Sequence, residues 1–188
     1  MSGGAAADQE VRRIVQTRRS LLARIAEELA SRPLIGNDHK CGPDLYPLLL
    51  PFPRPDMNVG FDWCAAFVYH CCLTAGINLP MKYPAPVQFR FAAVPAWLQW
   101  AQLPEIGFYS PAIGSAFAAK RGDIVVFDDI LGNGPHDHIG IVLRRRGDTL
   151  LTAEGNVDNR SGVFSRHRTE KVNGYIRIRD SYRFGEKP

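Results

Sequence analysis

The stretch FDWCAAFVYHCCLTAG, residues 61–76, holds three of the four cysteines of this 188-residue chain. Its apolar composition from Trp63 to Ala75 predicts a helix, and Gly76 is a residue type that commonly follows a helix end. Asp62 is a favourable residue type at a helix N-cap, which places Cys64 in the first turn. The stretch therefore predicts a buried helix with one thiol at its start and two near its end.

The three thiols of this helix are not equivalent. A cysteine nucleophile must be a thiolate, and both a helix N-terminus and a neighbouring imidazolium favour that form. Cys64 has the first of these features. Cys71 and Cys72 follow Phe67 and Val68 and are predicted to face the core as small hydrophobic residues. Four cysteines are too few for a disulfide scaffold in a chain of this length. Because of its place at the helix start, Cys64 is the candidate nucleophile.

Before this stretch, an amphipathic helix is predicted over residues 8–31. Its apolar positions recur at steps of three and four: Val11, Ile14, Val15, Leu21, Leu22, Ile25 and Leu29. Pro33 and Gly36 end it, and residues 34–60 are predicted to be irregular. We expect residues 1–33 to form an N-terminal helical extension and residues 34–188 to form a single globular unit.

After this stretch, the sequence changes from helical to strand patterns. A short helix is predicted over residues 95–102, with Pro95 in its first turn. Five β-branched or apolar runs then predict an antiparallel meander: residues 123–128 (DIVVFD), 138–143 (HIGIVL), 149–153 (TLLTA), 163–165 and 174–178 (GYIRI). Helices followed by strands indicate an α+β domain with segregated layers.

A cysteine nucleophile needs a base from elsewhere in the chain. His138 opens a predicted strand, so a sheet edge can present it to the helix start. Glu154 and Asn156 end the next strand, where antiparallel pairing places them beside His138. Because they are two residues apart on an extended segment, both side chains are expected on one face. The other histidines are expected to be incidental: His39, His70, His136 and His167.

The motifs WCAAFV, RGDIVVF, HIGIV and AEGN, in this order, resemble the CHAP family of cysteine amidohydrolases and peptidases, within the NlpC/P60-like, papain-type superfamily. The resemblance runs from about residue 61 to residue 178. It implies a papain-like α+β fold with helices packed on an antiparallel sheet. It also implies Cys64 as nucleophile, His138 as general base, and Glu154 with Asn156 as the orienting acid and amide.

The function that this resemblance implies is acyl transfer from an amide to water through a cysteine acyl-enzyme. CHAP relatives typically cut peptidoglycan, at the sugar–peptide amide or within stem and cross-bridge peptides. Two alternatives stay open: hydrolysis of a non-wall amide such as a glutathionylspermidine-like conjugate, and a non-catalytic binding module on the same fold. No cofactor is expected for the hydrolytic reaction.

A metal site is a further alternative from the residues themselves. His136 and His138 have ligand-like spacing, and Asp137, Glu154 or a cysteine would complete a set. Residues 56–62, DMNVGFD, invite comparison with a calcium loop, but Phe67 stands where an EF-hand needs a bidentate Glu. A looser structural calcium site is left open.

The composition indicates an ordinary globular chain, with 45% hydrophobic residues and a formal net charge of +4. Its arginine runs indicate either a solvated face or an anionic partner such as a cell-wall polymer. No nucleic-acid motif accompanies them. We see no signal-peptide pattern and no run long enough to span a bilayer, so we expect synthesis in the cytoplasm and a non-standard route to any cell wall. Nothing in the sequence indicates an oligomeric state.

Overall fold

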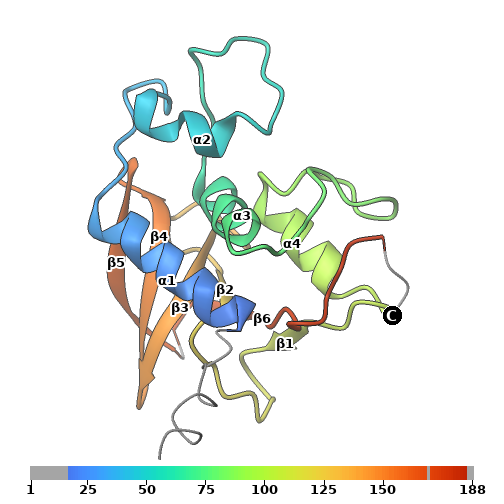
Figure 1. The fold of residues 1–188 in the computed structure, drawn as a ribbon. Helices are drawn as coiled ribbons and strands as arrows, with labels where there is room; N and C mark the ends of the chain where they lie inside the picture. The colour runs from blue at the N-terminus through green and yellow to red at the C-terminus, as the bar shows by residue number, and fades with distance from the viewer. Residues whose placement is uncertain (1–16, 169, 186–188) are drawn as a thin grey trace, which may run out of the picture.

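A six-stranded antiparallel sheet with strand order β1-β6-β2-β3-β4-β5 forms one layer of the protein. The computed structural model describes residues 17–168 and 170–185 (Figure 1). The helices are α1 (Arg18–Ser31), η1 (Pro43–Leu45, a 3-10 turn), α2 (Tyr46–Leu49), α3 (Cys64–Thr74) and α4 (Val94–Ala101). The strands are β1 (Tyr109–Pro111), β2 (Ile124–Phe127), β3 (His138–Arg146), β4 (Thr149–Val157), β5 (Arg160–His167) and β6 (Val172–Ile176).

The helices and the sheet form separate layers, as the order of the sequence patterns predicts. α1 and α3 lie across one face of the sheet, where α3 contacts β3 and β4 and α1 contacts β3, β4 and β5 (Figure 1). The apolar side of each helix and the apolar face of the sheet must be buried, and here they are buried against each other. The predicted α+β fold class, with helices packed on an antiparallel sheet, is confirmed.

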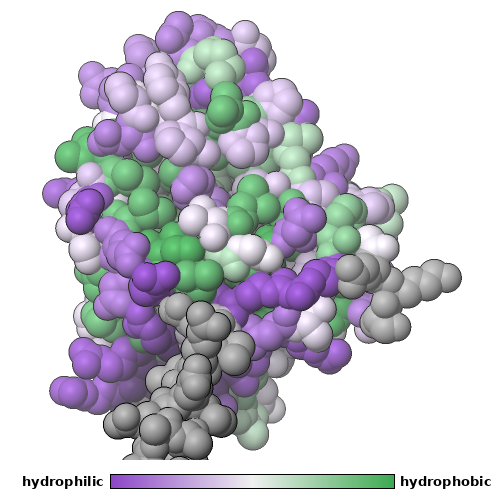
Figure 2. Space-filling view, viewed as in Figure 1, coloured by the Kyte–Doolittle hydropathy of each residue, from purple (hydrophilic) through white to green (hydrophobic). Residues whose placement is uncertain are grey.

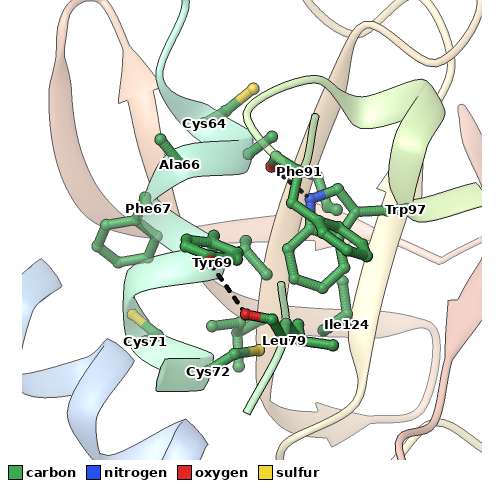
Figure 3. Close-up of a cluster of buried hydrophobic side chains, with 14 of the residues drawn as sticks. Cys64, Ala66, Phe67, Tyr69, Cys71, Cys72, Leu79, Phe91, Trp97 and Ile124 are labelled. Atoms are coloured by element: carbon green, nitrogen blue, oxygen red, sulfur yellow. Dashed lines mark hydrogen bonds between the residues drawn. The ribbon is translucent and has the colours of Figure 1, made fainter. Parts of the chain in front are cut away.

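α3 is a largely buried helix. Eight of its eleven residues are buried, including all three cysteines. Figure 3 shows Cys71 and Cys72 among the packed side chains near the helix end, whereas the Cys64 sulfur points away from that cluster at the helix start. A helix that is apolar on every side belongs inside the protein, between the sheet and other elements.

A glycine lets α3 lie against the sheet. At Gly155, a Cβ atom would lie 2.6 Å from Phe67 Cβ and 2.7 Å from a ring carbon of Trp63. Both partners belong to the start of α3, so a side chain at this position of β4 would push the helix away. The distance between the first turn of α3 and β4 therefore depends on this residue.

α1 shares its core with α3 and the sheet. Its N-cap is Thr17, whose hydroxyl accepts a hydrogen bond from the Ser20 N–H at 3.1 Å. Its small buried residues, Ala23, Ala26 and Ala30, allow close packing. Figure 2 shows hydrophobic residues gathered over α1, where Leu21, Ile25 and Leu29 are half-buried. The part of the predicted helix before residue 17 lies outside the described residues.

Several elements differ from the sequence prediction. The short η1 and α2 occupy the segment 34–60, which was expected to be irregular, and β1 was not predicted. β4 and β5 are longer than expected and meet in a tight hairpin, where Asp158 and Asn159 have φ of 51° and 58°. Such a turn usually carries a glycine, and its absence hid the hairpin in the sequence. In the described ranges, no helix has the length and apolarity to cross a bilayer.

Candidate active site

Cys64 is the first residue of α3 and is 4% exposed. The N-cap position belongs to Trp63, without a side-chain capping bond, so the prediction that Asp62 caps the helix is wrong. The Asp62 carboxylate instead accepts hydrogen bonds from Lys40 and from Asn156. The first N–H groups of a helix have no partner within it. The Cys64 N–H accordingly has no acceptor among the described residues.

His138 is the first residue of β3, and its side chain is fully buried. Its Nε2 lies 2.9 Å from Glu154 Oε2, while its Nδ1 makes no hydrogen bond of normal geometry in the described chain. Burial by itself lowers the pKa of His138, but the adjacent Cys64 and Glu154 outweigh burial and raise this pKa to about 9. The two ring nitrogens thus have different neighbours: Nε2 has Glu154, and Nδ1 is left for Cys64.

The Glu154 carboxylate is fully buried and accepts four hydrogen bonds. Thr152 Oγ1 and Arg166 Nε donate to Oε1 at 2.6 and 3.0 Å. Arg166 Nη2 and His138 Nε2 reach Oε2 at 2.6 and 2.9 Å. Burial raises the pKa of Glu154, but hydrogen bonds and charge from His138 and Arg166 lower it to about 2. The group is therefore a carboxylate at any pH near neutrality.

Gly140 makes room for the contact between Glu154 and His138. Gly140 pairs with Glu154 across β3 and β4, and a Cβ atom here would lie 2.7 Å from Glu154 Cγ. His138 is two residues earlier on β3, so its side chain lies on the same face of the sheet. The missing side chain lets the carboxylate lean along the strand to the imidazole.

Asn156 forms its side-chain hydrogen bond with Asp62 and none with His138, beside which the sequence analysis expects it. The pairing register of β4 shifts between Glu154 and Val157, and Asn156 has φ of 60°. A β-bulge of this kind breaks the two-residue alternation, so Glu154 and Asn156 point in different directions. Asn156 Nδ2 donates to Asp62 Oδ1 at 3.0 Å. Its side chain therefore ties the end of β4 to the segment that precedes α3.

Arg166 is a site residue that the sequence analysis missed. It lies on β5, and its side chain hydrogen-bonds to Glu154 on the neighbouring strand β4. The signal that would reveal it is the register of β4 and β5, in which Leu150 pairs with Arg166 and Glu154 pairs with Gly162. These pairings put Arg166 and Glu154 on one face of the sheet, but a single sequence does not define the register.

An open groove runs across Cys64. Its middle is formed by four residues: Asp62, Cys64, His136 and Asp137. One half continues along Phe61, Lys82, Gln88, Phe89 and Arg90, and the other along Lys40, Leu131, Asn133, Pro135 and Asn156. A separate cavity of about 160 Å³, between Tyr83, Glu105 and Tyr182, does not include Cys64. The candidate nucleophile therefore lies in the floor of a groove that extends on both sides.

His136 lies in this groove, although the sequence indicated an incidental loop residue. Its backbone has φ of 57°, and its N–H donates to Asp128 Oδ1 at 2.8 Å. Its ring Nδ1 is 2.9 Å from the same oxygen. His136 and His138 therefore contact different carboxylates, Asp128 and Glu154, instead of sharing one ligand. The described residues contain no group of three or more His, Cys, Asp or Glu side chains placed to hold a metal ion.

Comparison with known proteins places the chain in a family. Residues 56–156 match the family model of the CHAP domain. A solved structure, "The crystal structure of Ly7917", is 18% identical, with a TM-score of 0.43, over 87% of this chain and 63% of that chain. The chain thus spans less than two thirds of that protein's length, and no curated protein matches its sequence. Because the family match covers more than half of the chain, this protein belongs to the CHAP domain family.

Proposed function

We propose that this protein hydrolyses amide bonds of peptidoglycan, with Cys64 as nucleophile, His138 as general base and Glu154 as the orienting acid. CHAP domains are amidases and peptidases, commonly of peptidoglycan, and this chain carries such a domain. One observation carries the assignment of the residues. The Cys64 side chain adjoins the buried His138, whose other ring nitrogen is 2.9 Å from the Glu154 carboxylate.

The reaction proceeds through a thioester on Cys64. The thiolate attacks the amide carbonyl carbon, and the negative oxygen that forms accepts a hydrogen bond from the Cys64 backbone N–H at the helix start. His138, protonated in the thiolate–imidazolium pair, gives its proton to the leaving amine. Neutral His138 then takes a proton from water, and the resulting hydroxide attacks the thioester. The products are a free carboxylic acid and the regenerated thiolate.

Glu154 acts by fixing the imidazole. With a pKa of about 2 it stays ionised, so it holds a proton on Nε2 and leaves Nδ1 to exchange protons with Cys64 and the leaving group. Arg166 and Thr152 fix the carboxylate in turn. A polar network supported in this way keeps the ring in one orientation. Asn156 has a different task, which is to hold the Asp62 segment next to Cys64.

The shape of the groove supports a polymeric substrate. It is open and continues on both sides of Cys64, so an extended peptide can pass across the thiol. The test is to digest purified peptidoglycan and identify the new ends by mass spectrometry. We expect each cut to produce one new amino group and one new carboxyl group. New reducing sugar ends, or no new ends, would contradict the proposal.

A further inference from the structure

The two halves of the groove differ in charge. In the half lined by Lys40 and Asn156, the ammonium group of Lys40 pairs with the Asp62 carboxylate, so its positive charge is already neutralised. The other side chains of that half are apolar or uncharged amides, such as Leu131 and Asn133. This half therefore presents hydrogen-bonding groups and little net charge to a substrate. We call it the neutral half.

The opposite half carries two cations, Lys82 and Arg90, and we call it the basic half. Within the described ranges, neither has a carboxylate at ion-pairing distance. Arg90 Nη1 donates to the Pro53 carbonyl oxygen at 3.2 Å, which holds the guanidinium in place with its other N–H groups unused. Lys82 is exposed, and its ammonium group forms no hydrogen bond or ion pair with any described residue.

The acidic residues of the groove do not cancel these two charges. Asp62 is paired with Lys40. Asp137 accepts hydrogen bonds from three backbone N–H groups of its own loop, those of Ile130, Leu131 and Asn133, at 3.0, 2.8 and 3.3 Å. These three donors occupy both of its oxygens, and among the described residues neither Lys82 nor Arg90 lies within ion-pairing distance of them. The positive charge of the basic half remains available to a ligand.

Apolar surface lies next to these cations. Phe89 is 46% exposed, and the half-buried Phe61 lines the same half of the groove. Aromatic surface beside two cations suits a peptide with an apolar part and a negative group, and guanidinium groups favour carboxylates. We propose that the basic half binds a free carboxylate of the substrate, so that the enzyme prefers peptides with a carboxylate on that side of the cleaved amide. This inference rests on the proposed function and names its substrate class.

The test uses two synthetic peptides with the same scissile amide, one carrying a side-chain carboxylate next to it and the other the corresponding carboxamide. For the native protein we expect a lower KM for the carboxylate peptide. The double variant Lys82→Gln/Arg90→Gln should raise that KM about tenfold, each exposed ion pair contributing a few-fold, and leave kcat and the carboxamide KM nearly unchanged. Raising the salt concentration should also raise the KM of the carboxylate peptide.

The control is Arg144→Gln/Arg146→Gln, which removes the same charge from exposed positions of β3 outside the groove. It should leave the preference intact. Equal KM values for the two peptides, or equal losses for both in the Lys82/Arg90 variant, would overturn the inference while the hydrolase assignment stands. If the native protein cleaves neither peptide and Cys64→Ala binds neither in a calorimetric titration, both the inference and the proposed function fail. Preferential binding of the carboxylate peptide by Cys64→Ala supports the basic half independently of turnover.

Discussion

Four charged or ionisable side chains form a chain of contacts at the site: Cys64 next to His138, His138 next to Glu154, and Glu154 next to Arg166. With the thiol as thiolate and the imidazole protonated, the network has two positive and two negative groups. Buried charges are stable only when they are paired and hydrogen-bonded. Glu154 is the member that contacts both cations, at 2.9 Å to His138 and 2.6 Å to Arg166. Changing either neighbour therefore changes the charge that the other one experiences.

Glu154→Gln should lower the maximal rate about 100-fold and move the basic limb of the pH–rate profile to lower pH. The carboxylate is one of the groups that raise the pKa of His138 to about 9. Without it, the imidazolium loses its proton at a lower pH. Asn156→Ala should lower the rate with little movement of either limb, because Asn156 contacts Asp62. If the basic limb does not move in Glu154→Gln, Glu154 does not set the pKa of the catalytic imidazole.

Arg166→Met should move the same limb in the opposite direction. Without the guanidinium, the Glu154 charge acts on His138 alone, and the pKa of the imidazole rises. The free energy of unfolding should fall by about 2 kcal/mol or more, because a buried carboxylate loses two donors. Arg168→Met, which removes a more exposed ion pair with Asp148, is the control and should cost about 1 kcal/mol or less. If the basic limb shifts in the same direction in Arg166→Met and Glu154→Gln, the claim that Arg166 and His138 share the charge of Glu154 is contradicted.

Cys71→Ala and Cys72→Ala should change stability and not chemistry. Both thiols are fully buried, and burial raises the pKa of each well above its ordinary value. Each substitution should lower the free energy of unfolding by about 1 kcal/mol, measured by urea denaturation, because it leaves a small cavity. Alkylation of Cys71 or Cys72 in the folded protein at a rate similar to that of Cys64 would show that they are not core residues.

At the scale of elements, the site depends on how closely α3 approaches β4. Gly155→Ala should reduce activity strongly, because its methyl group meets Phe67 and Trp63 at the start of the helix. The expected displacement of Cys64 from His138 lowers kcat, since small errors in the placement of reacting groups are costly. A crystal structure of the variant checks the displacement. Native kcat in Gly155→Ala would mean that the helix position does not control the site.

The sequence predicts elements that have a strong local pattern and misses details that depend on tertiary contacts. The helix with the cysteines and the strands before and after His138 follow from apolar runs that end at glycine or charged turns. The position of Asn156 does not follow, because the bulge after Glu154 breaks the alternation that the prediction assumes. Arg166 and His136 are missed for a related reason. The strand register that brings Arg166 to Glu154 and the loop conformation that places His136 in the groove are set by the folded protein.

At the scale of the whole molecule, the buried network links stability to pH. The pKa of His138 is raised from 6.5 to about 9. Its contribution to the free energy of unfolding is therefore complete below pH 6.5 and is lost as the pH rises to about 9. The pKa of Glu154 is lowered from 4.5 to about 2, so its contribution is complete above pH 4.5 and is lost as the pH falls to about 2.

We therefore expect the part of the unfolding free energy that these two groups supply to be largest between pH 4.5 and 6.5. Urea titrations at a series of pH values from about 2 to about 9 measure the acid loss and the alkaline loss on either side of this range. In Cys64→Ala the alkaline loss should be smaller, because His138 no longer has a thiolate partner. An alkaline loss of the same size in Cys64→Ala would show that the interaction between Cys64 and His138 contributes nothing to the raised pKa.

The central claim is that Cys64, and neither of the other α3 thiols, carries out the chemistry. The most direct test is the rate of amide hydrolysis by Cys64→Ala and Cys71→Ala, measured side by side on the same peptidoglycan after circular dichroism confirms that both are folded. We expect no hydrolysis above background in Cys64→Ala and a rate close to that of the native protein in Cys71→Ala. A near-native rate in Cys64→Ala would contradict the account.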